Sequence, residues 1–223
     1  MSTMSIRSWR KAELLRIDEI IPAEDIEEPR LKYLLASLRE KKVLHRPIIV
    51  EHRKMLVIDG HHRLRALEAS GAKLVPVILA DYRSDVRSVG RWMYIGSWSI
   101  DRETVLKRGL EELEHLVKRG GSRKIEAKVR NETMSIKADR LDAYISLKYS
   151  ELLRRVMNEL SKVPFDEGKC RSSEICLSFP ELEIDDMYRI PYTSLLPPRS
   201  TLHETSLKEI EVPFKLNDLG GRF

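Results

Sequence analysis

Cysteine is scarce in this sequence, and no apolar run is long enough to cross a membrane. Among 223 residues the only cysteines are Cys170 and Cys176, with no second pair and no histidines at ligand spacing. A zinc finger is therefore not expected, whereas a local disulfide and two free thiols both fit. The N-terminus also lacks the apolar core of a signal peptide, so a cytoplasmic protein without a membrane partner is expected.

The chain also has little excess charge. Charged residues make up 34% of the sequence, yet the formal net charge is only +5, with Lys and Arg spread along the chain. This balance mildly favours small anionic ligands and does not by itself indicate nucleic acid. The dominance of Glu, Lys and Arg among the charged residues is typical of thermophiles. No internal repeat or low-complexity tract is present, and the length suits one large or two small domains.

A strand-to-helix turn in the first third of the chain carries the strongest functional signal. The apolar run at 55–58 ends in Asp-Gly, and a helical pattern begins with His61, His62 and Arg63. Gly60 allows a sharp turn, and the first amides of the helix carry the positive end of its dipole. Together these features predict a phosphate site, although a simple helix cap with a solvated first turn has the same pattern.

The elements around this turn predict a compact α/β unit over residues 14–82. Pro29 suits the first turn of a helix, and Pro76 favours an edge or bulge position for its strand. Apolar runs predict strands at 14–17, 48–50, 55–58 and 75–79. The later part of the chain reads as α+β, with helices at 102–118 and 141–160 and strands within 124–137 and at 175–177.

Two further segments hold candidate binding residues. Trp92 lies in an aromatic stretch that suits either the core or the wall of a ligand pocket. Near the C-terminus, two prolines precede Arg199, Ser200, Thr201 and His203. These four side chains suit an anion or a polar substrate, but a surface loop followed by a helix start at 200–201 fits the same residues.

The turn and its surroundings resemble the ParB/sulfiredoxin superfamily, in which the equivalent turn binds nucleotide phosphates. The match covers roughly residues 14–82 and centres on the residues 59–63, Asp-Gly-His-His-Arg. Within that superfamily the whole chain is most similar to the archaeal free L-serine kinases, which make O-phosphoserine for cysteine synthesis. Three features carry this closer likeness: Pro22-Ala23-Glu24, Trp92, and the Pro-Pro-Arg-Ser-Thr-Leu-His segment at 197–203.

The resemblance implies a Mg²⁺-dependent transfer of a phosphoryl group from ATP or ADP to the serine hydroxyl. It implies a ParB/sulfiredoxin-like nucleotide-binding domain at 1–82, and a second α+β portion at 83–223 that supplies substrate-binding residues and closes the active-site cleft. Glu24 is the candidate base, although the neighbouring acids Asp25, Glu27 and Glu28 are alternatives. Asp59 is a partner for Mg²⁺ or for the substrate hydroxyl.

The resemblance also divides the remaining site residues by ligand. Those expected to hold the nucleotide are Arg46, Gly60, His61, His62 and Arg63. Those expected to hold serine are Trp92, Arg199, Ser200, Thr201 and His203.

Differences from other members of the superfamily limit which of their activities are expected here. Sulfiredoxins carry a catalytic cysteine beside the Gly of this turn, where this chain has His61, so a sulfinic-acid reductase is not expected. No recognition helix can be placed after residue 82, which makes nucleic acid an unexpected partner. A ParB-like, nucleotide-dependent DNA-binding or regulatory protein is nevertheless the alternative to the kinase. A nuclease would need a cluster of metal-binding carboxylates, and none is evident.

Overall fold

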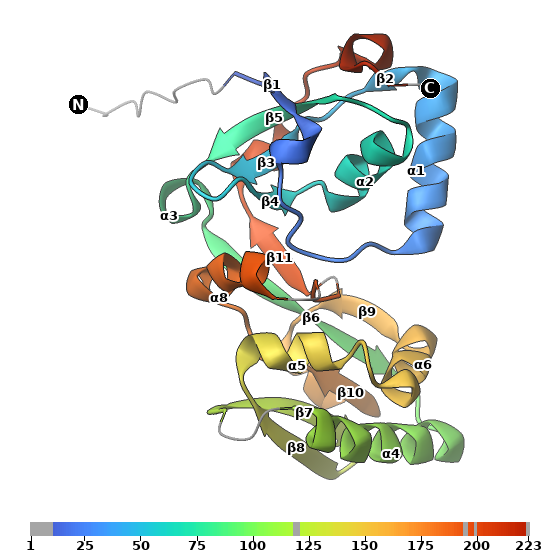
Figure 1. The fold of residues 1–223 in the computed structure, drawn as a ribbon. Helices are drawn as coiled ribbons and strands as arrows, with labels where there is room; N and C mark the ends of the chain where they lie inside the picture. Colours follow the sequence, from blue (N-terminus) through green and yellow to red (C-terminus); the bar gives the residue numbers. More distant parts are fainter. Residues whose placement is uncertain (1–10, 118–120, 194–195, 199, 222–223) are drawn as a thin grey trace, which may run out of the picture. The chain divides into compact units, whose positions relative to one another are not determined.

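The computed structural model describes residues 11–117, 121–193, 196–198 and 200–221. The chain divides into two compact units (Figure 1). The first unit comprises Met1–Pro22, Ile26–Asp85 and Thr205–Phe223, and the second comprises Ala23–Asp25 and Val86–Glu204. This division differs from a single boundary at 82/83, because the C-terminal segment packs with the first unit and three residues around Glu24 pack with the second.

The first unit is built on a four-stranded sheet in the order β1-β5-β3-β4. Strands β3 and β5 are parallel, with Ile48 opposite Val77, and the other neighbours are antiparallel. The strands are β1 (Glu13–Arg16), β2 (Val43–Leu44), β3 (Ile48–Glu51), β4 (Leu56–Asp59), β5 (Leu74–Ala80) and β12 (Phe214–Lys215). The helices are α1 (Glu28–Lys41), α2 (His61–Ala69), α3 (Tyr82–Asp85) and the short 3-10 helices Ile17–Glu19, Ser206–Glu209 and Leu216–Leu219.

The core of this unit explains why the sequence folds in this way. Every residue of β3 is buried: the apolar run 48–50, as expected for a strand covered on both faces, and Glu51, whose carboxylate accepts from the amides of Arg53 and Lys54. Helix α1 has proline in its first turn and buries Leu31 and Leu38, and it packs against α2 beside the sheet (Figure 1). Leu216 and Leu219 complete the same core, so the C-terminal segment is part of the unit that holds the turn at Gly60.

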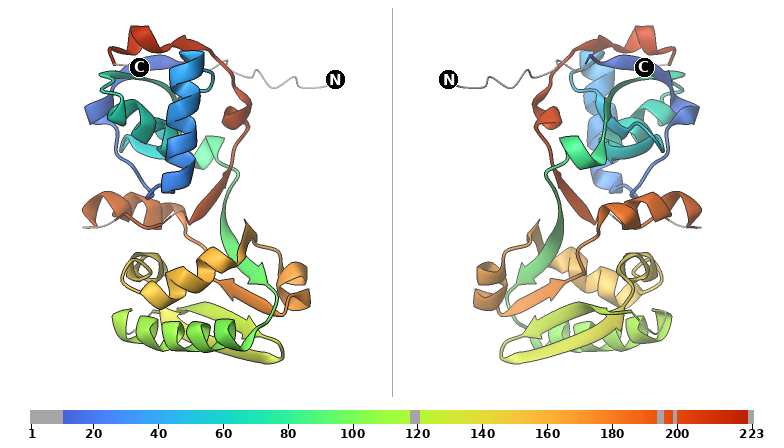
Figure 2. Two further views of the ribbon diagram at one scale, coloured as in Figure 1. Left: turned by 90° about the vertical axis from the view of Figure 1, so that its right-hand side faces the viewer. Right: turned by 90° about the vertical axis from the view of Figure 1, so that its left-hand side faces the viewer.

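The second unit is built on a sheet in the order β11-β6-β10-β7-β8, with β9 also paired to β6. The strands are β6 (Ser88–Gly96), β7 (Arg123–Val129), β8 (Glu132–Ala138), β9 (Ser161–Pro164), β10 (Ile175–Ser178) and β11 (Thr201–Glu204). The helices are α4 (Ile100–Leu116), α5 (Arg140–Ser146), α6 (Glu151–Glu159), α7 (Glu167–Ser172), α8 (Ile184–Arg189) and the 3-10 helix Ile190–Tyr192. Helix α4 packs against α6 and runs alongside the β7–β8 hairpin (Figure 2).

Two local predictions were wrong, and a third holds only at one residue. Strand β5 lies between β1 and β3 in the sheet, but Pro76 itself pairs only with Leu14 of β1, because the pairing with β3 begins at Val77. The expected helix at 141–160 is two helices, because the Ser150 side chain caps α6 by accepting from the amide of Leu153. The segment at 200–201 begins a strand, β11, and not a helix.

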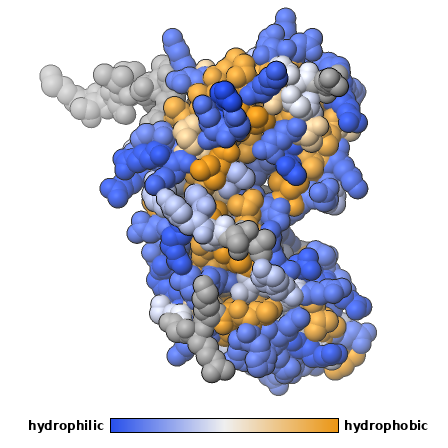
Figure 3. All heavy atoms as spheres, viewed as in Figure 1, coloured by the Kyte–Doolittle hydropathy of each residue, from blue (hydrophilic) through white to orange (hydrophobic). Residues whose placement is uncertain are grey.

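The visible face of each unit carries charged residues with apolar ones between them (Figure 3). The largest exposed apolar side chains lie on different elements: Tyr33 on α1, Ile100 on α4, and Tyr149 and Tyr192 elsewhere in the second unit. Within the described ranges, no helix is both long and apolar enough to pass through a bilayer.

Cys170 and Cys176 form a disulfide that joins α7 to β10, with their Cα atoms 5.3 Å apart.

The disulfide closes a short loop in the unfolded chain and so lowers the entropy of that chain. This stabilises the fold by about 2 kcal/mol. Reduction should therefore lower the melting temperature by roughly 5 °C, measured by scanning calorimetry with and without reductant. The Cys170→Ser/Cys176→Ser variant should have the melting temperature of the reduced protein, and reductant should not change it. Equal melting temperatures for the oxidised and the demonstrably reduced protein would contradict the expectation.

Candidate active site

The turn between β4 and α2 has the geometry of an anion site. Gly60 is the N-cap of α2, with φ +107° and ψ 22°, and it offers no side chain to the amides of the first helical turn. Those amides carry the positive end of the helix dipole, which favours a negatively charged group. The backbone conformation requires glycine, so the sequence signal and the structure agree at this residue.

The Arg63 side chain holds this turn in place through three contacts. Its Nη1 atom donates to the backbone carbonyls of Arg46, at 2.9 Å, and of Pro47, at 2.7 Å, while Nη2 pairs with the Asp59 carboxylate. Burial lowers the pKa of the Arg63 guanidinium, and the charge of Asp59 opposes that shift. The sequence predicted that Arg63 grips phosphate directly; in the structure its donors hold the turn and the start of β3 together.

Two other candidate residues of the first unit also have protein partners. His62 accepts a hydrogen bond at Nε2 from the amide of Glu27, the N-cap of α1, at 3.0 Å. Arg46 donates from Nε and Nη2 to Glu211, at 3.0 and 2.7 Å, with both side chains more than half exposed. Because an exposed ion pair is worth little, the pair with Glu211 holds Arg46 only weakly.

Lys208 joins the turn from the C-terminal segment. Its Nζ lies 3.8 Å from Oδ1 of Asp59, while Oδ2 of Asp59 pairs with Arg63. The Asp59 carboxylate therefore faces two cations. Sequence reasoning missed Lys208, because nothing in its local sequence signals a contact with a residue so far along the chain.

In the second unit, a buried carboxylate organises the other predicted residues. Glu24 is 6% exposed, and its Oε1 accepts four hydrogen bonds. The amide and hydroxyl of Ser200 donate at 3.0 and 3.1 Å, and those of Thr201 at 2.6 and 2.5 Å. Donors of this kind favour the ionised carboxylate and fix the backbone at 200–201.

Thr201 connects this carboxylate to two further candidates. Its hydroxyl lies 3.4 Å from Nδ1 of His203, which is buried, and its carbonyl accepts from Nε1 of Trp92 at 2.9 Å. The β6–β11 pairing sets this arrangement, because Thr201 lies opposite Arg91, the neighbour of Trp92. Four of the five residues predicted to bind serine are thus grouped around Glu24.

The segment around Glu24 has a second attachment to its unit. Lys148 Nζ pairs with Asp25 Oδ2 at 2.7 Å, and the amide of Asp25 donates to the carbonyl of Pro197 at 2.8 Å. Asp25, an alternative to Glu24 as base, therefore has a structural role. Glu28, another alternative, is exposed at the start of α1.

The structure therefore gathers the predicted residues into two groups, one within each unit. The first-unit group is Arg46, Asp59, Gly60, His61, His62 and Arg63. The second-unit group is Glu24, Trp92, Ser200, Thr201 and His203. Arg199 lies outside the described residues, and the predicted closure of the second portion over a cleft stays a prediction.

Thr201→Val tests the link between Thr201 and Glu24. This change keeps the side-chain shape and removes a buried hydroxyl that donates to a carboxylate, so we expect a loss of about 1.5–3 kcal/mol in the free energy of unfolding. Urea titration measures this loss, and Thr201→Ser, which keeps the hydroxyl, is the matched control. Equal stability of Thr201→Val and the unmodified chain would show that the hydroxyl adds nothing.

One part of the chain matches a known family of domains. Residues 6–89 match the ParB N-terminal domain family, as the sequence of this segment predicted.

Its curated relatives include L-serine kinases. The chain is 30% identical over 157 residues to an ATP-dependent L-serine kinase of Desulfurococcus mucosus, which aligns 66% of this chain with 62% of that protein. It is 37% identical over 103 residues to that of Staphylothermus marinus, covering 44% of this chain and 41% of the relative. An ADP-dependent L-serine kinase of Thermococcus kodakarensis is 28% identical over 106 residues, or 45% of this chain and 44% of the relative. The aligned segments thus span less than two thirds of these relatives.

Solved structures extend the likeness in fold to nearly the whole chain. A glutamate-to-alanine variant of a free serine kinase, in complex with ADP, matches with a TM-score of 0.71 and 19% identity over 93% of both chains. A free serine kinase in complex with AMP matches with a TM-score of 0.70 and 20% identity, again over 93% of both. The predicted fold, a ParB-like domain with a further α+β portion, is therefore confirmed.

Proposed function

We propose that this protein is a free L-serine kinase that transfers a phosphoryl group from ATP or ADP to the serine hydroxyl, giving O-phospho-L-serine. The first unit binds the phosphates of the nucleotide at the Gly60 turn. The second unit binds serine and supplies Glu24 as the base that accepts the hydroxyl proton. Positioning and neutralisation of charge are the main requirements of phosphoryl transfer, and the two groups of residues supply them.

The arrangement around Glu24 is the observation that carries this proposal. A buried carboxylate accepts from two amides and two hydroxyls, and Trp92 and His203 contact the same threonine. Five of the predicted site residues are therefore joined in one network. It lies outside the segment that matches the ParB N-terminal domain, apart from Glu24 itself. The 30% identity to an ATP-dependent L-serine kinase runs over 157 residues, which is longer than the ParB match, and so supports the kinase over other ParB-domain functions.

Mg²⁺ is proposed as the counter-ion of the nucleotide. Among the described residues, no three His, Cys, Asp or Glu side chains are grouped to hold a metal ion. Mg²⁺ in phosphoryl-transfer enzymes is commonly held by substrate phosphates together with one or two protein carboxylates. Asp59 is the candidate carboxylate; binding there would compete with its pairing to Arg63 and Lys208.

The direct test is an assay for O-phosphoserine from free L-serine and Mg²⁺, with ATP and ADP in separate reactions and at both moderate and high temperature. Product with one donor, lost on chelation of the metal, would establish the kinase and its donor. The ParB-like alternative is tested on the same sample by duplex-DNA binding at low and high salt. Absence of product with either donor, together with salt-dependent duplex binding, would refute the kinase.

A further inference from the structure

The second unit contains a charged cavity that the proposed reaction does not use. Its volume is about 420 Å³, which suits a small metabolite. Residues of β6, β7, α5 and the segment before α8 line it: Arg91, Arg123, Lys124, Glu126, Arg140, Pro180, Glu181 and Glu183. Four cations and three carboxylates thus face one space.

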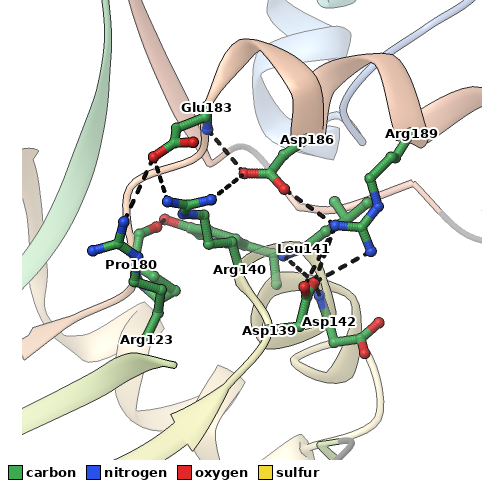
Figure 4. Close-up of polar contacts among 10 residues, drawn as sticks. Arg123, Asp139, Arg140, Leu141, Asp142, Pro180, Glu183, Asp186 and Arg189 are labelled. Atoms are coloured by element: carbon green, nitrogen blue, oxygen red, sulfur yellow. Dashed lines mark hydrogen bonds and ion pairs between the residues drawn. The ribbon is translucent and has the colours of Figure 1, made fainter. Parts of the chain in front are cut away.

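Some of these charges are already paired within the protein. Glu183 lies between Arg123, at 3.6 Å, and Arg140, with which it also forms an ion pair (Figure 4). Arg140 further contacts Asp186 at 3.7 Å, and Arg189 joins Asp186 to the rest of this network. The three cations Arg123, Arg140 and Arg189 are thus balanced by the three carboxylates Asp139, Glu183 and Asp186, so this network is a poor candidate for holding a ligand by charge.

Charges of both signs remain for a ligand. Lys124 and Glu126 are two residues apart on β7, so they lie on the same face of the strand, opposite the buried Ile125. Within the described ranges, neither Lys124, Glu126 nor Glu181 forms an ion pair or a side-chain hydrogen bond. The cavity thus keeps one unpaired cation and two unpaired carboxylates.

Arg91 adds a cation that the protein holds in place. Its guanidinium stacks over the Phe165 ring, 3.7 Å from the centroid, and Nη1 donates to the carbonyl of Phe179 at 2.6 Å. Its Nε is fully buried and so is not open to a ligand. Arg91 lines the cavity and carries no ion pair among the described residues, so its positive charge acts on whatever the cavity holds.

We propose that this cavity binds a free α-amino acid as a zwitterion. Arg91 and Lys124 face the carboxylate, and Glu126 and Glu181 face the ammonium. A phosphate or dicarboxylate would bring its charge against two unpaired carboxylates, which disfavours a simple anion. A simple cation would likewise be repelled by Arg91 and Lys124. The opposed pairs therefore select a ligand with both charges.

The test is calorimetric titration of the full chain with L-amino acids other than serine, since the proposed active site also takes serine. At least one amino acid should bind, and Lys124→Met and Glu181→Gln should each weaken it at least tenfold. Lys137→Met is the matched control, because Lys137 lies opposite Lys124 in the β7–β8 pair and does not line the cavity. The Lys137→Met variant should bind the amino acid with unchanged affinity.

Single-charge probes decide the ligand class. Propionate and propylamine, which carry one charge each, should bind far more weakly than the amino acid. Tighter binding of inorganic phosphate than of any amino acid, weakened by Lys124→Met, would replace the zwitterion with an anion and overturn the proposal. Absence of binding by every amino acid at 10 mM, on the order of 100-fold above the expected dissociation constant, would also overturn it. None of these outcomes depends on whether the chain phosphorylates serine.

Discussion

Replacing Glu24 with glutamine should lower kcat for serine phosphorylation by about 10²–10⁴-fold, the usual contribution of a general base. Glutamine has nearly the same shape and keeps a carbonyl oxygen, which can still accept from the donors of Ser200 and Thr201. The change therefore removes proton-accepting ability more than it removes structure. Steady-state rates, with ATP or ADP according to which one gives product in the assay, measure the effect.

A second substitution separates the chemical role of Glu24 from its structural one. Glu24→Ala would leave the amides and hydroxyls of Ser200 and Thr201 without their acceptor, so it should lower stability as well as kcat. Glu24→Gln should fold and melt close to the unmodified chain. Glu28→Gln is the matched control, since Glu28 is an exposed acid four residues away, and its activity should be unchanged.

The opposite result would be equally clear. If Glu24→Gln keeps kcat within threefold while Glu24→Ala loses it, Glu24 positions the loop at 200–201 and another group accepts the proton. The four hydrogen bonds to Oε1 give Glu24 a positioning role whichever group accepts the proton.

The sequence predicted the Gly60 turn well because its signal is local. An apolar strand, a glycine and a helical pattern lie side by side in the chain, and the backbone at Gly60 has the conformation that only glycine adopts cheaply. The role of Arg63 is not local. Its guanidinium reaches carbonyls at Arg46 and Pro47 through the packing of α2 on β3, and no pattern in the sequence specifies that reach.

The choice of Glu24 among four neighbouring acids could not be made from the residues alone and came from the family resemblance. Four acids lie within five positions of one another, and composition does not separate them. In the structure Glu24 is buried, Asp25 is tied to Lys148, and Glu28 is exposed. The partners of Glu24 lie 176 and 177 residues away, so its selection depends on long-range packing that the local sequence does not encode.

The division at 82/83 that the sequence suggested differs from the structure at the C-terminal segment for a similar reason. Residues 205–223 pack with the first unit through β12, which pairs with β2, and through Leu216 and Leu219 in the core. Both paired strands are only two residues long, and so short a strand has no periodicity to detect. Lys208 reaches Asp59 as a result of this packing.

Replacing Gly60 with alanine should weaken ADP or ATP binding at least 100-fold, which corresponds to about 2.7 kcal/mol. A Cβ there would lie 3.0 Å from Nη2 and 3.1 Å from Nε of Arg63, and φ +107° is strained for alanine. Arg63 would have to move away from the carbonyls of Arg46 and Pro47, and the first turn of α2 would shift with it. Stability should fall by about 1–3 kcal/mol for the strained backbone.

Gly71→Ala is a control that carries a similar backbone penalty without the collision. Gly71 also has a positive φ, +72°, but a Cβ there would meet nothing within 4 Å. This variant should lose about 1 kcal/mol of stability and keep its nucleotide affinity. Calorimetric titration with both nucleotides and thermal unfolding of both variants measure the difference. Unchanged nucleotide affinity in a folded Gly60→Ala variant would show that the phosphates bind elsewhere, and the nucleotide half of the proposed site would then have to be abandoned.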